Sequence, residues 1–294
     1  MKKCLVYSLA VCLFSWAVFG VAFLALGGSF QSNSVLLTLI KAVYMLFPML
    51  VAGVIQLINK EPFRSTGLLE FKINWTWLVA LVLPVIAVAV CVLVSALFPG
   101  VRLHFGADQM ISMQGLDEAM AASVQEQLSS MPPAALIGAT VISGLISGCT
   151  INAVFAFGEE YGWRNYMVSV MEGIGFWKKA LVIGFVWGIW HFPLILLGHN
   201  YPQHPVLGVA LMCVFCILTG IIELYLVLKS GSVYPAAIFH GTINALAALV
   251  LLLVEGGNDI TIGMSGLAGF IALILTIAAI WIYDRYISAD RIMG

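Results

Sequence analysis

The chain has 294 residues, of which 62% are hydrophobic and only 9% are charged. An ordinary soluble domain has about 45–50% apolar and about 25% charged residues, so this composition excludes a soluble globular protein. The formal net charge of −1 provides no basic surface for a polyanion, and we expect no nucleic-acid partner.

Long apolar segments follow one another along the whole chain. Since about 20 apolar residues cross the hydrocarbon core of a bilayer, we predict an all-α, polytopic membrane protein with about eight transmembrane helices. The whole chain, 1–294, then forms a single transmembrane domain embedded in the lipid bilayer. The predicted spans are residues 4–26, 35–58, 75–98, a long segment within 134–173, 180–198, 206–228, 233–254 and 264–283.

The basic residues predict the orientation, because cytoplasmic loops carry an excess of lysine and arginine. Only Arg102 falls in the loops of one side, whereas ten basic residues fall on the other. Both termini are therefore predicted to be cytoplasmic, and we expect an integral protein of a bacterial plasma membrane. The ten residues are Lys2, Lys3, Lys60, Arg64, Lys72, Lys178, Lys179, Lys229, Arg285 and Arg291.

The predicted outer loop 99–133 is the longest polar stretch. Its apolar residues recur at helical spacing, which predicts a short amphipathic helix on the outer face. These residues are Leu116, Met120, Val124 and Leu128.

The fourth span contains the stretch FGEEYGWRN, residues 157–165, whose charged groups are costly inside a membrane. Glu160 and Arg164 are four residues apart and can pair on one helical face. Glu159 lies about 100° further round the helix and points elsewhere. We expect this span to continue to about residue 172, with a kink or close helix packing near Gly148.

Polar residues recur at a similar depth in later spans. His191 lies in the fifth span, and His240 and Asn244 lie four residues apart on one face of the seventh. At 1.5 Å rise per residue, both histidines lie roughly 17 Å from the cytoplasmic helix ends. Glu223 in the sixth span is expected to extend to the membrane interface near Lys229.

Each of these polar groups has a structural explanation when taken singly, but together they form a chemically coherent set. A carboxylate and an imidazole can hold and deprotonate a water molecule. An imidazole N–H and an amide NH₂ on another helix suit a developing oxyanion. Hydrolysis of an amide by water requires both a pair of groups that activates the water and a pair that stabilises the oxyanion.

Three motifs resemble one family. EEYGWR, WGIWH and HGTIN occur in the order found in the CAAX protease and bacteriocin-processing (Abi-type) family of intramembrane endopeptidases, which includes the Ras-converting CAAX prenyl endopeptidase. The resemblance covers about residues 134–250, the expected catalytic core. It implies an eight-helix fold with a cavity open to the cytoplasm, and cleavage of a membrane-associated or lipidated substrate near its C-terminus or in a leader peptide.

Carried over by motif, the resemblance implies that Glu159 and His191 activate the water, and that His240 and Asn244 form the oxyanion site. It implies that Glu160 and Arg164 form a supporting ion pair and that no cofactor is needed. The family usually has phenylalanine four residues before the second-motif histidine. Trp187 stands there in this chain, which leaves the chemistry in place and is expected to reshape the pocket.

Two alternatives remain open from the sequence. In a zinc-dependent version of the same protease, Glu159, His191 and His240 would be the metal ligands, with water in the fourth position. In a non-catalytic protein, the same residues would serve bacteriocin or toxin immunity, or form a proton relay in a transporter.

Overall fold

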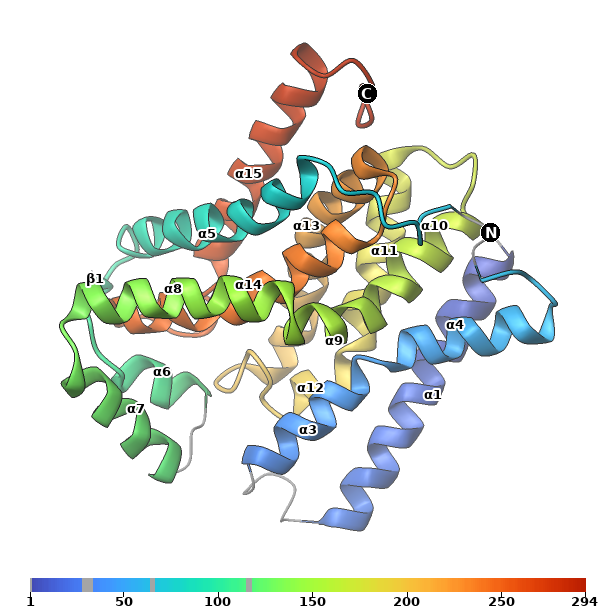
Figure 1. Ribbon diagram of the computed structural model, residues 1–294. Helices are drawn as coiled ribbons and strands as arrows, with labels where there is room; N and C mark the ends of the chain where they lie inside the picture. Colours follow the sequence, from blue (N-terminus) through green and yellow to red (C-terminus); the bar gives the residue numbers. More distant parts are fainter. Residues whose placement is uncertain (1, 28–33, 64–66, 115–117) are drawn as a thin grey trace.

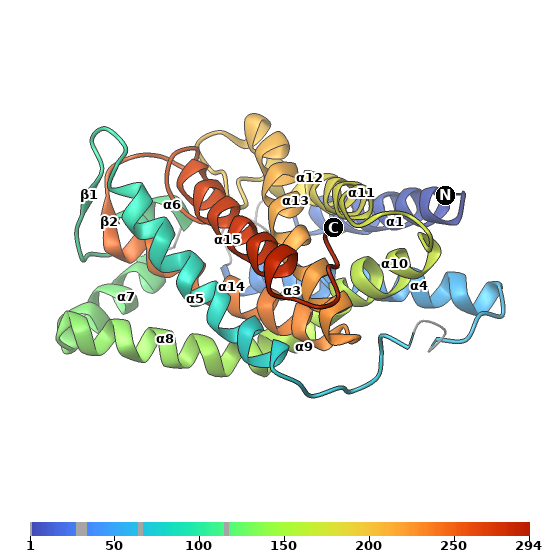
Figure 2. The same ribbon diagram turned by 90° about the horizontal axis from the view of Figure 1, so that it is seen from above.

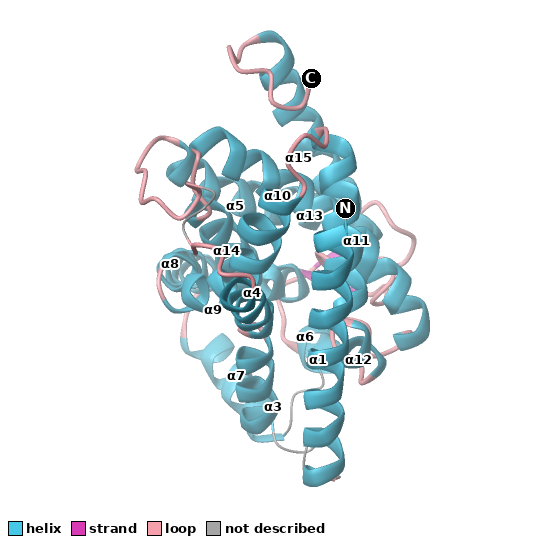
Figure 3. Ribbon diagram, turned by 90° about the vertical axis from the view of Figure 1, so that its right-hand side faces the viewer, coloured by secondary structure: helices cyan, strands magenta, loops and turns pink. Residues whose placement is uncertain are grey.

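The computed structural model describes residues 2–27, 34–63, 67–114 and 118–294. Helices dominate these ranges, and the all-α prediction is confirmed (Figure 3). One pair of two-residue strands is also present: β1 (Arg102–Leu103) is antiparallel to β2 (Val254–Glu255). The helices are α1 (Lys2–Leu26), α3 (Ser34–Tyr44), α4 (Phe47–Ile58), α5 (Thr76–Ser95), α6 (Asp108–Gln114), α7 (Glu118–Ser130), α8 (Pro133–Cys149), α9 (Ile151–Glu160), the π-helix η1 (Tyr161–Tyr166), α10 (Met167–Val170), α11 (Phe176–Trp190), α12 (Phe192–Leu196), α13 (Pro205–Ser230), α14 (Tyr234–Leu253) and α15 (Leu267–Tyr286).

Within the described residues, six helices are long and apolar enough to cross a membrane, and a bent pair adds a seventh span. The chain is therefore an integral membrane protein, but the predicted count of eight is not confirmed. The difference falls at 180–198, where α11 has only 15 residues and ends at Trp190. Pro193 explains this end, because it has no N–H to donate to the carbonyl four residues back and its ring clashes with that carbonyl, so α11 cannot continue and a new helix begins at Phe192 with proline in its first turn.

The predicted kink in the fourth span is confirmed. The helix breaks at Thr150, and its two parts, Pro133–Cys149 and Ile151–Val170, are bent by 48°. Gly148 lies at this bend and packs against α14, since a Cβ added there would lie 2.7 Å from Thr242 Cα. The absence of a side chain thus allows the two backbones to approach closely.

Helix α14 occupies the middle of the bundle, with α5, α8, α9 and α13 around it (Figures 1 and 2). In its most apolar stretch 72% of the residues are buried, compared with 22% in the peripheral helix α1. Large apolar side chains on the outer face of α1, such as Leu5, Leu9 and Leu13, are exposed. In a membrane protein such a face contacts lipid.

Polar contacts join the loops that the charge pattern assigns to one side. Lys3 pairs with Glu61, with 2.6 Å between Nζ and Oε1, and Lys229 pairs with Asp290 at 2.5 Å. Away from the N-terminus, β1 and β2 join two loops that are predicted to be outside (Figure 2). The grouping of the loops agrees with the predicted topology, whereas the cytoplasmic placement of the termini stays a prediction.

The predicted outer helix is present as α7, which contains Met120, Val124 and Leu128. Val124 and Leu128 are partly buried against the core, while Met120 is exposed. Leu116 lies outside the described residues.

Candidate active site

The two adjacent glutamates lie at the end of α9, where the helix changes its hydrogen-bond pattern. Glu159 and Glu160 are followed directly by η1, in which the Met167 N–H bonds to the Gly162 carbonyl five residues back. π-Helical segments are rare and occur frequently at functional sites. Both glutamates are buried, as is every residue of η1.

His191 lies at the break between α11 and α12. Its backbone N–H donates to the Gly188 carbonyl at 3.1 Å, which leaves the Trp187 carbonyl free of its usual helical partner. The His191 Nδ1 takes that place and donates to the Trp187 carbonyl at 2.8 Å. Because a carbonyl only accepts, Nδ1 carries the hydrogen, and in the neutral ring Nε2 presents a lone pair.

Close packing of α11 against α13 fixes this part of the site. A Cβ added at Gly184 would lie 2.6 Å from Ile217 Cα, and one added at Gly188 would lie 2.9 Å from the Cys213 nitrogen. Small residues at this four-residue spacing let two helices meet backbone to backbone. The side chains of Trp187 and His191 are thereby carried on a helix with little freedom to shift.

Trp187 contacts several of the predicted site residues. Its indole Nε1 donates to Glu159 Oε2 at 2.5 Å. Its ring centroid lies 5.3 Å from that of His240 and 5.9 Å from that of His191. The structure thus brings the carboxylate and both imidazoles around one indole ring.

The Glu160–Arg164 ion pair predicted from the four-residue spacing is confirmed, with 3.2 Å between Glu160 Oε2 and Arg164 Nε. Arg164 also contacts Glu223 through Nη2, and His240 Nδ1 lies 2.8 Å from Glu160 Oε1. The Arg164 guanidinium carbon lies 4.3 Å from the centroid of the Trp187 ring. Four ionisable groups and an aromatic ring thus form one buried network.

The expectation that Glu223 extends to the interface is wrong. Its side chain is fully buried and contacts Arg164. Glu223 precedes Lys229 by six residues, about 9 Å along the helix. This distance indicates a buried position, but it does not identify Arg164 as the partner.

Asn244 is less closely integrated than its neighbours. It lies one turn after His240 on α14, as predicted, but it is exposed, whereas His240 is buried. The structure gives it no hydrogen-bond partner among the described residues. Its amide is therefore available to an external group.

Glu160, Glu223 and His240 have ligand atoms within 4.8 Å of one another, the spacing expected of a metal site. This set shares only His240 with the zinc ligands considered from the sequence. Arg164 contacts both carboxylates, and Glu160 engages His240 Nδ1. These donors do not fit a divalent cation, because the guanidinium already supplies the positive charge between them.

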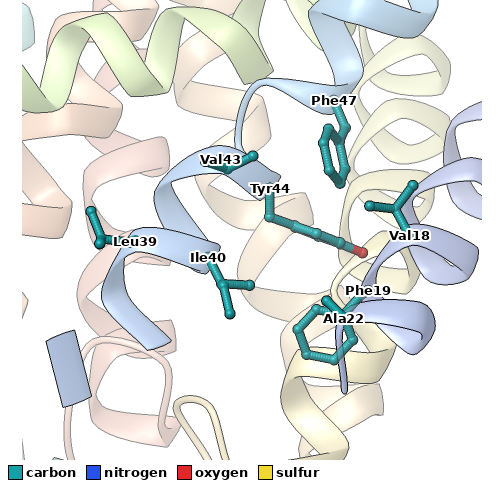
Figure 4. A pocket seen from close by; sticks show the side chains of 8 residues that line it. All are labelled: Val18, Phe19, Ala22, Leu39, Ile40, Val43, Tyr44 and Phe47. Carbon is teal, nitrogen blue, oxygen red and sulfur yellow. The ribbon is translucent and has the colours of Figure 1, made fainter. Parts of the chain in front are cut away.

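An apolar cavity of about 200 Å³ lies beside the site, between α1 and α3–α4 (Figure 4). Tyr44 crosses this cavity with its hydroxyl directed toward α1. The hydroxyl donates to the Trp190 carbonyl at 2.8 Å, and the two rings stack with centroids 4.3 Å apart. Trp190 in turn contacts the His191 ring, with centroids 4.8 Å apart, so Tyr44 and Trp190 link the cavity to the site. The cavity is lined by Val18, Phe19, Ala22, Leu39, Ile40, Val43, Tyr44 and Phe47.

Comparison with known proteins agrees with these features. The family model described as "Type II CAAX prenyl endopeptidase Rce1-like" matches residues 140–246. The CAAX prenyl protease 2 of Methanococcus maripaludis is 29% identical over 141 residues, which cover 46% of this chain and 48% of that protein. The chain thus aligns with about half the length of this curated relative. The matched region 140–246 contains all six predicted site residues.

Proposed function

We propose that the chain is an intramembrane endopeptidase of the type II CAAX prenyl endopeptidase (Rce1-like) family, whose model matches residues 140–246. It hydrolyses a peptide bond in a membrane-associated protein or peptide. The observation that carries this proposal is the meeting of Glu159, His191 and His240 around the Trp187 indole inside the bundle.

Glu159 and His191 activate the attacking water in this proposal. The carboxylate of Glu159 accepts a proton from the water, while the lone pair on His191 Nε2 accepts a hydrogen bond from it. The water oxygen attacks the carbonyl carbon of the substrate. When the carbon–nitrogen bond breaks, the proton held by Glu159 passes to the leaving amine, so the carboxylate is restored.

His240 and Asn244 stabilise the oxyanion that forms during the attack. In the imidazolium form both ring nitrogens of His240 donate. Nδ1 is directed to Glu160, which then acts as its counter-ion, and Nε2–H remains for the oxyanion. The exposed Asn244 amide provides the second donor. Such donors stabilise the transition state most when they are fixed in advance.

Arg164 holds the carboxylates of Glu160 and Glu223 together, and the proposed mechanism needs no metal ion.

The apolar cavity beside Trp190 favours a substrate with an apolar segment or a lipid chain next to the scissile bond. We further propose that the site opens to the cytoplasm, in agreement with the loop charges.

A comparison of membrane proteomes from cells with and without the protein tests the function. We expect new C-terminal or leader fragments only where wild-type protein is present, and none with a Glu159→Gln variant. Identical fragment sets in all three strains would contradict an endopeptidase and favour a binding role.

Chelation should leave the activity unchanged, because Arg164 rather than a metal ion neutralises the buried carboxylates. The measurement is cleavage of a membrane-anchored reporter peptide in proteoliposomes before and after 1,10-phenanthroline treatment, together with the zinc content of the purified protein. One zinc per chain, lost together with activity, would move the assignment to the zinc-dependent alternative.

A further inference from the structure

Trp187 makes two contacts that no other described residue combines. Its indole Nε1 donates to Glu159 Oε2, and its backbone carbonyl accepts from His191 Nδ1. Glu159 lies on α9 and His191 lies at the end of α11. A single residue therefore bonds to both groups that would activate the water, although these groups come from different helices.

The position of the indole ring is itself fixed from several sides. The Arg164 guanidinium carbon lies 4.3 Å from the ring centroid, and Trp187 is only 3% exposed. Gly188, which directly follows Trp187, lets the α11 backbone pack directly on α13. A ring held in this way directs its N–H to one point, the Oε2 atom of Glu159.

The contact also distinguishes the two oxygens of the Glu159 carboxylate. Oε2 is engaged by the indole N–H, whereas Oε1 has no donor among the described residues. The carboxylate cannot turn without losing a hydrogen bond to a charged acceptor, which is a strong one. Oε1 is therefore the oxygen presented to a water molecule.

We propose that Trp187 is a positioning residue for the water-activating pair, through its indole N–H to Glu159 and its carbonyl to His191. This inference rests on the proposed function. It is specific to this chain: tryptophan stands where the family usually has phenylalanine, and its indole N–H supplies Glu159 with a hydrogen-bond donor that phenylalanine lacks.

The first test observes the hydrogen bond itself and needs no activity. The protein has eight tryptophans, and their indole N–H groups give separate resonances after ¹⁵N-tryptophan labelling in detergent. In Glu159→Gln protein one indole proton should move upfield, because a neutral acceptor makes a longer and weaker bond than a carboxylate. The same resonance should be missing from Trp187→Phe protein. An unchanged spectrum of Glu159→Gln would overturn the contact, whether or not Trp187→Phe folds.

The second test measures the consequence for catalysis. Trp187→Phe should lower kcat for the reporter peptide by about ten- to hundredfold, the loss expected for one hydrogen bond to a charged group, with KM unchanged. Trp163→Phe is the matched control, since Trp163 is fully buried and its indole Nε1 has no partner among the described residues. It should keep the wild-type kcat.

The two tests separate the possible failures. A shifted indole resonance with a wild-type kcat in Trp187→Phe would overturn the positioning role and leave the proposed function intact. Equal losses of kcat in Trp187→Phe and Trp163→Phe would assign Trp187 to packing alone. A wild-type protein that cleaves no reporter would remove the proposed function, and the positioning role with it.

Discussion

Glutamine in place of Glu159 is expected to abolish cleavage while the protein still inserts and folds. The amide keeps the shape of the carboxylate and can accept the Trp187 N–H, but it cannot take a proton from water. Loss of a general base reduces the rate by about 10²- to 10⁴-fold. The measurement is the initial rate of reporter cleavage in proteoliposomes, with the melting temperature, Tm, recorded on the same preparation.

Two further site variants and one control outside the site are compared with Glu159→Gln in the same assay. His191→Ala should cause a loss similar to that of Glu159→Gln, whereas Asn244→Ala removes one oxyanion donor and should leave a measurable rate, lower by about 10²–10³-fold. Glu255→Gln should have the wild-type rate, because Glu255 pairs with the exposed Arg102 side chain between β1 and β2. A wild-type rate in folded Glu159→Gln protein would exclude Glu159 as the base.

Methionine in place of Arg164 is expected to cause the largest loss of stability. Arg164 contacts Glu160 and Glu223, and all three side chains are at most 1% exposed. Its removal leaves the buried Glu223 carboxylate without a counter-ion and leaves Glu160 with His240 alone, and breaking a buried pair costs on the order of 3–5 kcal/mol in the free energy of unfolding. Thermal unfolding in detergent should show a clearly lower Tm.

Two further variants give this measurement its controls. Arg102→Met breaks an exposed ion pair, which contributes little, and its Tm should equal that of the wild type. The triple variant Glu160→Gln, Arg164→Met and Glu223→Gln removes the charges together and should recover part of the lost stability. A wild-type Tm in Arg164→Met alone would contradict the structural importance of the network.

Local spacing predicted those parts of the site that lie within one helix. Glu160 and Arg164 pair because residues four apart are neighbours on a helix, and this geometry does not depend on tertiary packing. The break near Gly148 follows in the same way from small residues that permit close helix contact.

The contacts between helices were not accessible from spacing. Glu223 reaches Arg164 because α13 packs beside the glutamate helix, and no property of the segment around Glu223 specifies that neighbour. The contact of Trp187 also depends on tertiary packing, since its indole N–H meets Glu159 only at one rotation of α11 relative to α9. The count of eight spans used length and composition alone, whereas the break at His191 depends on the local effect of Pro193.

The most direct test of the account is a single turnover of the reporter peptide in ¹⁸O-water, with excess protein and analysis by mass spectrometry. Water activated by Glu159 attacks the substrate directly, so the new C-terminal carboxylate of the product should carry one ¹⁸O atom. The peptide that contains Glu159 should remain unlabelled. An intact reporter, or an unlabelled product together with ¹⁸O in Glu159, would contradict hydrolysis by a water molecule that Glu159 activates.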